Sequence, residues 1–182
     1  RDMAQRRAIF HVQFRKQPFD GGYAVAAGLE TAVRFLENFA FSGEDLRYLA
    51  SLEGADGEAM FEPAFLDFLR DEPHRLNIDA VPEGAVVFSH EPLVRVEGPI
   101  WLAQLVETPL LAIVNFQTLI ATKAARVCSA AKGDPVLEFG LRRAQGVDGG
   151  LSASRAACIG GCTATSNVLA GKLYGVPVKG TH

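Results

Sequence analysis

The stretch that decides the fold runs from Val136 to Gly180 and reads VLEFGLRRAQGVDGGLSASRAACIGGCTATSNVLAGKLYGVPVKG. Its apolar run Val136–Leu141 predicts a short strand, and Val176–Gly180 predicts another. The segments Leu151–Gly160 and Ser166–Tyr174 between them predict helices. Strand, helix and strand at this spacing are typical of a βαβ unit with parallel strands, so the sequence predicts an α/β fold.

The region before this unit predicts a mixed α/β module. Ala8–Arg15 alternates apolar and polar residues, as a half-buried strand does, and Leu76–Pro99 is rich in strand formers with Gly and Pro at its turns. Helices are expected over Tyr23–Ala40, from the N-cap Ser42 to Leu52, and over Pro63–Arg70. We place a boundary near residues 98–100, which divides the chain into an N-terminal domain (1–99) and a second domain (100–182).

A long helical stretch, Trp101–Ala131, opens the second domain. Pro109 should kink or restart this helix, because proline has no backbone N–H and collides with the preceding turn. The alanine content and the spacing of the apolar residues predict that the helix is buried.

Composition excludes several classes of function. The net charge is −3 and no Lys/Arg run occurs, so neither a nucleic acid nor an anionic membrane surface is an expected partner. No apolar stretch reaches the about 18 residues of a membrane span.

Three cysteines without a dense pattern argue against a disulfide framework and indicate a reducing, cytoplasmic compartment. The histidines lack metal-ligand spacing, and Cys158 and Cys162 lack partner ligands, so no metal site is predicted.

The candidate binding residues follow the two predicted strands, where parallel α/β folds bind ligands. Phe139, Arg142 and Arg143 follow the first. In an extended segment, neighbouring side chains point to opposite faces, so one arginine would face the pocket and the other would brace its wall. An arginine fork matches a carboxylate and an aromatic ring can stack on a flat ligand, which together predict a clamp for an aromatic acid. The alternative is that both arginines pair with surface carboxylates.

Gly180 and Thr181 follow the second strand and would let backbone N–H groups approach an anion. The glycine-rich segment Gln145–Gly150 is expected to form a loop that could do the same. Such loops are common in proteins, so neither identifies a ligand by itself.

Five ordered blocks carry a resemblance to a known family. They are Phe14–Tyr23, then Glu107–Leu111 with Asn115–Thr118, then Glu138–Gly146, Ser166–Gly171 and Tyr174–Thr181. Along nearly its whole length the chain resembles nicotinate phosphoribosyltransferases, which are type II phosphoribosyltransferases. The resemblance implies an α+β N-terminal domain packed on an irregular α/β barrel, of which the chain holds the first part. It also implies a homodimer with active sites near the subunit interface.

The activity implied by the resemblance joins nicotinate to phosphoribosyl pyrophosphate, giving nicotinate mononucleotide and pyrophosphate in NAD salvage. Mg²⁺ normally assists the departure of pyrophosphate, and many members couple ATP hydrolysis through a phosphorylated histidine. By the same resemblance, Arg142 matches the arginine that holds the nicotinate carboxylate, and Phe139 lines the pyridine pocket. Arg143 is adjacent, and Gly180 and Thr181 match a strand-end loop that contacts substrate.

The residues Thr163–Thr165 fall where the amide-using relatives place an acidic side chain, and their hydroxyls and Ala164 favour an acid substrate. The family's phosphorylated histidine belongs to a Gly-Thr-x-Ala-His-Ser block, in which His182 occupies the x position. No catalytic residue is therefore assigned.

A family tyrosine that reaches the neighbouring subunit would precede Arg1, and the later barrel strands would follow His182. We therefore expect a fragment that lacks both ends and is inactive by itself. The alternatives are a truncated, non-catalytic metabolite-binding or dimerisation module, and a relative that uses nicotinamide or quinolinate.

Overall fold

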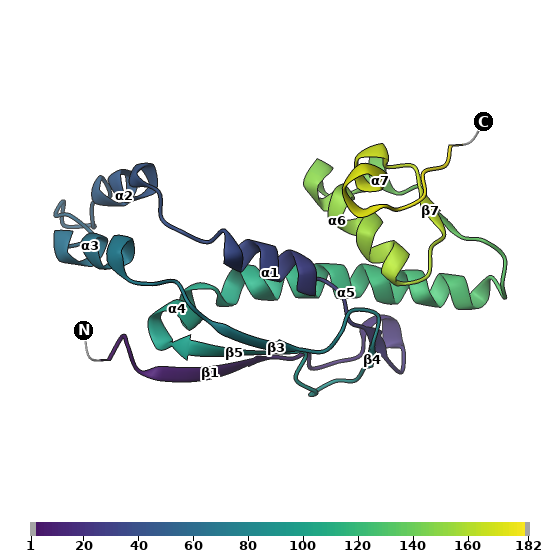
Figure 1. The fold of residues 1–182 in the computed structure, drawn as a ribbon, viewed down its shortest axis with the longest axis horizontal. Helices are drawn as coiled ribbons and strands as arrows, with labels where there is room; N and C mark the ends of the chain where they lie inside the picture. The colour runs from purple at the N-terminus through teal and green to yellow at the C-terminus, as the bar shows by residue number, and fades with distance from the viewer. Residues whose placement is uncertain (1–2, 181–182) are drawn as a thin grey trace.

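The computed structural model describes residues 3–180. A single long helix, α5 (Glu107–Ala130), runs along the molecule (Figure 1). The N-terminal sheet lies along one side of α5, and the helices α2 (Gly43–Ala50) and α3 (Pro63–Asp71) form a separate group at one end. The C-terminal helices α6 (Gly146–Ile159) and α7 (Val168–Tyr174) lie against the other end of α5. This arrangement of mixed helices and strands confirms the predicted α/β class.

The N-terminal sheet is antiparallel and has the strand order β1-β5-β3. Its strands are β1 (Arg7–Val12), β5 (Val94–Pro99) and β3 (Asn77–Ala80). The predicted alternation of β1 is confirmed, because Phe10 and Val12 pack on the main hydrophobic core while their neighbours along the strand are exposed. The core receives its central aliphatic residues from β5, α4 (Ile100–Leu105) and the first half of α5.

The first helix, α1 (Leu29–Glu37), is shorter than predicted. Ala24 and Val25 form the strand β2 instead, which pairs with β4 (Val86–Val87). Gly28 adopts a φ of 103°, a left-handed conformation that suits glycine and sets the helix start. The starts of α2 and α3 are confirmed: Ser42 forms a capping box with Asp45, and Pro63 lies in the first turn of α3.

The predicted restart of the long helix is also confirmed. The chain breaks at Val106, between α4 and α5, and Pro109 lies in the first turn of α5. Pro109 cannot donate a hydrogen bond to the preceding turn, which favours a break in the helix near this point.

The helix α5 is long and apolar enough to cross a membrane, but only by length and composition. Its buried polar side chains bind the N-terminal module: the Thr122 hydroxyl accepts a hydrogen bond from Val25 N at 2.9 Å, and Thr118 accepts one from Ala27 N at 3.2 Å. Because these groups are buried in contacts within the protein, we assign α5 to the core.

The C-terminal unit has parallel strands, as predicted, but its second strand is β7 (Ala164–Thr165), which lies between the two predicted helices and was not expected. β7 pairs in parallel with β6 (Leu137–Glu138). The expected strand Val176–Gly180 contributes a single parallel bridge, between Val178 and Thr165. Two other details differ from the prediction. The expected strand Val136–Leu141 ends after Glu138, and the chain then enters a 3-10 helix, η2 (Leu141–Arg143).

The expected glycine loop, residues 146–150, is instead the first turn of α6. Asp148 favours a helix N-terminus, where it complements the helix dipole. Gly150 lies so close to the Leu141 side chain that a Cβ at this position would collide with it. Gly150 therefore allows η2 to pack closely against α6.

Candidate functional site

The ends of β6 and β7 and the bridge residue Val178 meet at one edge of the C-terminal unit. Glu138 pairs with Thr165, and Thr165 pairs with Val178. The backbone continues this register, with Ser166 N donating to Glu138 O at 3.1 Å and Lys179 N donating to Thr165 O at 3.0 Å. Residues that follow each strand therefore share the edge at which parallel sheets bind ligands.

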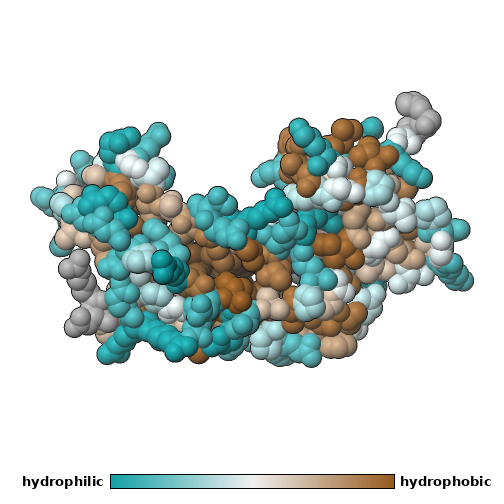
Figure 2. All heavy atoms as spheres, in the orientation of Figure 1, coloured by the Kyte–Doolittle hydropathy of each residue, from teal (hydrophilic) through white to brown (hydrophobic). Residues whose placement is uncertain are grey.

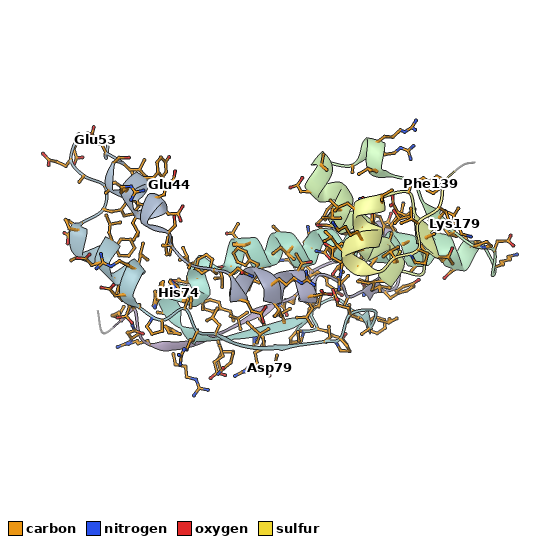
Figure 3. All side chains as sticks on the ribbon, turned by 45° about the horizontal axis from the view of Figure 1, so that its top comes forward. Glu44, Glu53, His74, Asp79, Phe139 and Lys179 are labelled. Atoms are coloured by element: carbon orange, nitrogen blue, oxygen red, sulfur yellow. The ribbon has the colours of Figure 1, made fainter. Side chains whose placement is uncertain are left out.

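Phe139, Arg142 and Arg143 lie at this edge, as predicted, but not in the predicted conformation. Gly140 turns the chain into η2, in which Arg143 N donates to Gly140 O at 3.0 Å. Both arginines are therefore exposed on one turn, and the extended conformation from which the pocket-and-wall arrangement was argued is wrong. Phe139 is half-buried, and Figure 3 places it in the same C-terminal part of the molecule as Lys179.

Within the described part of the chain, no carboxylate forms an ion pair with Arg142 or Arg143. Among residues 3–180, every ion pair involves other arginines, and neither Arg142 nor Arg143 takes part in one. The alternative of surface ion pairing therefore has no support in the described residues, and both guanidinium groups face solvent.

An open cavity of about 760 Å³ lies between α5, η2 and α6. Arg143 and Gly140 line its rim, Lys123 adds a second cation, and most of the remaining lining is apolar. A cavity of this size falls within the range of small-molecule sites, about 300–1,000 Å³. Arg142 and Phe139 do not line it, so the structure brings only part of the predicted set to the cavity.

The second predicted strand end is only partly described. Gly180 is exposed, and nothing lies within 4 Å of the position that a Cβ would occupy there. Thr181 and His182 lie outside the described residues. The segment Thr163–Thr165, which was expected to distinguish an acid from an amide substrate, carries no acidic side chain. Its residues Ala164 and Thr165 are fully buried.

Sequence reasoning missed the polar cluster beneath η2. The Glu138 carboxylate accepts hydrogen bonds from Gly140 N, from the Thr165 hydroxyl at 2.7 Å and from the Ser154 hydroxyl at 3.0 Å. Asn167 joins the cluster through Ser154, with an Nδ2–Oγ distance of 3.3 Å, and caps α7 by accepting from Ala170 N. The available signal was a carboxylate inside an apolar strand, because such a group requires partners when buried.

A second missed cluster joins the C-terminal unit to the N-terminal module. Arg155 of α6 binds both carboxylate oxygens of Glu83, at 2.8 and 2.5 Å, and one oxygen of Glu30 at 2.6 Å. Burial acts to raise the pKa of the Glu83 carboxyl, but hydrogen bonds from Arg155 and Gly28 N outweigh it and hold that pKa below its ordinary value. Hydrogen bonding to Glu83 likewise raises the pKa of Arg155, so the pair stays ionised.

The three cysteines are free thiols. Burial, together with Cys128, raises the pKa of Cys162 to about 12, and burial also raises the pKa of Cys158. Both thiols are therefore protonated at neutral pH and poorly suited to act as nucleophiles. In the described part of the chain, no three His, Cys, Asp or Glu residues lie close enough to hold a metal ion.

Residues 1–115 match the family model described as the nicotinate phosphoribosyltransferase (NAPRTase) N-terminal domain. The chain is similar to nicotinate phosphoribosyltransferase 2 of Arabidopsis thaliana, with 50% identity over 179 residues, 97% of this chain and 31% of that protein. A nicotinate phosphoribosyltransferase of Caenorhabditis elegans is 51% identical over 96% of this chain and 31% of its own length. The chain thus spans about a third of the length of these relatives.

The fold is similar to a crystal structure of human nicotinic acid phosphoribosyltransferase. That match has a TM-score of 0.89 and 45% identity, and covers 100% of this chain and 36% of the human chain. A nicotinate-nucleotide pyrophosphorylase from Pyrococcus furiosus matches with a TM-score of 0.68 and 26% identity, over 98% of this chain and 36% of that chain.

Proposed function

Because the chain belongs to the nicotinate phosphoribosyltransferase family, we propose that the protein joins nicotinate to phosphoribosyl pyrophosphate, giving nicotinate mononucleotide and pyrophosphate. One observation within the chain carries the proposal. Two arginines that form no ion pair among residues 3–180 lie on one turn, η2, after the parallel strand β6, and Arg143 lines an open cavity there.

The chemistry of the edge fits two anionic substrates. A guanidinium group can bind the planar nicotinate carboxylate through two parallel hydrogen bonds, and a second one beside it can bind a phosphate oxygen. We assign the carboxylate to Arg142 and a phosphate oxygen to Arg143, and we assign Phe139, Gly180 and Thr181 to the same substrate site. Transfer passes through an oxocarbenium-like state, so these residues would act by positioning the pyridine nitrogen against the sugar carbon.

Mg²⁺ and ATP are part of the proposal through the family resemblance. Mg²⁺ binds through one or two carboxylates together with substrate phosphates. In the described residues the carboxylate at the edge, Glu138, is already engaged by three hydrogen bonds. The residues present therefore do not form a Mg²⁺ site, and we derive no step through the ion or through a phosphorylated histidine.

We also propose a cytoplasmic homodimer. The free thiols fit a reducing compartment. Apolar side chains gather over α6 and α7 (Figure 2), where Val147 and Val168 are 79% and 70% exposed, and such a surface is typical of an interface. Sedimentation equilibrium tests the dimer, and cell fractionation tests the compartment.

The activity is tested by incubating nicotinate and phosphoribosyl pyrophosphate with the protein, with and without ATP. Both the 182-residue chain and the longest form that the gene encodes are assayed. We expect mononucleotide from the long form and none from the chain alone. No product from either form would favour the non-catalytic binding module, and faster turnover of nicotinamide or quinolinate would identify an amide- or diacid-using relative.

The carboxylate clamp is tested by Arg142→Ala. Loss of a charged hydrogen bond costs about 1.5–3 kcal/mol, so we expect the KM for nicotinate to rise by about 10- to 100-fold. Arg47→Ala, which removes an exposed arginine of α2, is the control and should leave the KM unchanged. An unaltered nicotinate KM in a folded Arg142→Ala variant would refute the clamp.

A further inference from the structure

We infer that Glu138 is a positioning residue, which sets the placement of the arginine-bearing turn η2 through its carboxylate. This inference rests on the proposed function, because η2 carries the residues that we assign to substrate. Glu138 lines the cavity, but both of its carboxylate oxygens accept hydrogen bonds from the protein, so we expect it to act through η2 and not on the substrate.

The Glu138 carboxylate contacts the turn η2 directly. One Glu138 oxygen accepts the N–H of Gly140, which is the N-cap of η2. A Cβ on Gly140 would lie 2.9 Å from that oxygen, although the φ of Gly140, −86°, is open to any residue. A Cβ here would displace the carboxylate, so its close approach, and not the backbone conformation, favours glycine.

The other oxygen of the Glu138 carboxylate is held by buried side chains. It binds Thr165 of β7 and Ser154 of α6, both of which are fully buried. Asn167 N donates to the Thr165 hydroxyl at 3.0 Å, which ties the start of α7 to the same group. One carboxylate thus connects η2 to a strand and two helices whose positions are fixed by packing.

Apart from Glu138, the contacts that hold η2 lie mainly on the side of the turn that faces α6. Leu141 packs against Gly150 of α6, while Arg142 and Arg143 are exposed and have no ion-pair partner in the described residues. Hydrogen bonds from outside the turn are what hold a functional side chain within the fraction of an ångström that binding requires. Without the Glu138 carboxylate, η2 would keep its sequence but lose its fixed distance from the strand ends.

The test uses the full-length enzyme and compares Glu138→Ala with Glu138→Gln. The alanine variant removes every hydrogen bond, and we expect the KM for nicotinate to rise at least about tenfold with kcat within about twofold, because ground-state and transition-state binding weaken together. The glutamine variant keeps an oxygen for Gly140 N and an amide for the hydroxyls, so it should restore most of the affinity. Hydrogen exchange at Gly140–Arg143 should quicken in the alanine variant.

The matched control is Glu91→Ala. The Glu91 carboxylate also accepts a backbone N–H, that of Phe88 at 2.9 Å, but in an exposed turn outside the edge, so the KM should not change. If Glu138→Ala does not fold, Thr165→Val and Ser154→Ala each remove one donor from the carboxylate and should raise the KM by smaller factors.

Several results would overturn the inference. One is a wild-type KM in Glu138→Ala, or in both hydroxyl variants. Another is a lower kcat at unchanged KM, which would report a smaller folded fraction and a merely structural role. Equal impairment by Glu138→Gln and Glu138→Ala would mean that the charge itself acts on substrate. Absence of product from the wild-type enzyme is a different result, because it would refute the proposed function and the inference with it.

Discussion

Arg155 of α6 forms a bidentate ion pair with Glu83, in the segment before β4. The two residues are 72 positions apart in the chain. The Arg155 and Glu83 side chains are only 11% and 18% exposed. Glu83 also accepts Gly28 N at 2.6 Å, at the start of α1, so a single carboxylate joins the C-terminal unit to the N-terminal module. The edge that carries Arg142 and Arg143 is thereby held in place relative to the main core.

Loss of either partner should destabilise the protein. Breaking a buried ion pair costs about 3–5 kcal/mol. Because Glu30, on one side of the cluster, is partly exposed to solvent, we expect Arg155→Ala to lower the free energy of unfolding by about 2–3 kcal/mol. Urea unfolding of the full-length protein measures it. The control Arg70→Ala removes an arginine that pairs with exposed Asp67 and Asp71, and should cost less than about 1 kcal/mol. Equal losses of unfolding free energy in the two variants would show that the Arg155–Glu83 pair stabilises the protein no more than an exposed ion pair does.

The pH dependence of the pair follows from the lowered pKa of Glu83. A carboxyl with a lowered folded-state pKa contributes its full stability above its unfolded value, near the ordinary 4.5, and loses it as the pH falls through the folded value. The difference in unfolding free energy between wild type and Glu83→Gln should therefore be constant from about pH 8 to pH 5 and shrink below about pH 4.5. A difference that grows on acidification would contradict the assignment.

Gly160→Ala should weaken the contact between α5 and α6. A Cβ at this position would lie 2.7 Å from the Ala124 Cβ and would also collide with the backbone oxygen of Ala121. We expect a loss of about 1–3 kcal/mol, measured by thermal or urea unfolding.

The control for that variant is Gly149→Ala, in the same helix. Its Cβ would meet only the Gln145 Cβ, at 3.9 Å, so the substitution should be neutral or stabilise the protein by up to about 1 kcal/mol. Similar effects of the two alanines would argue against a close helix contact at Gly160.

Cys162 should react slowly with iodoacetamide at pH 8. Its raised pKa, about 12, leaves little thiolate, and burial limits access. We expect labelling at least about tenfold slower in the folded protein than in urea, as followed by peptide mass spectrometry. Equal rates in the two states would show that the thiol is exposed and ordinary.

The parts of the fold that were predictable depend on neighbours in the chain. The capping box at Ser42, the restart before Pro109 and the alternation in β1 each arise from interactions within a few residues, so the local sequence was sufficient. The helix α6 and the strand before it were predictable for the same reason, but the two-residue strand β7 was not. Phe139, Arg142 and Arg143 follow β6, as the local pattern of the sequence indicated.

The sequence by itself determined the class of fold, the family and the edge at which Phe139, Arg142 and Arg143 lie. Only the tertiary structure decided their conformation. The chain leaves the strand after Glu138, whose carboxylate binds Gly140 N and the hydroxyls of Ser154 and Thr165, and Gly150 of the following helix packs against Leu141. These contacts, like the pairing of Arg155 with Glu83, join residues that no local pattern relates, since a buried charged or polar group takes whichever partner the packing brings to it.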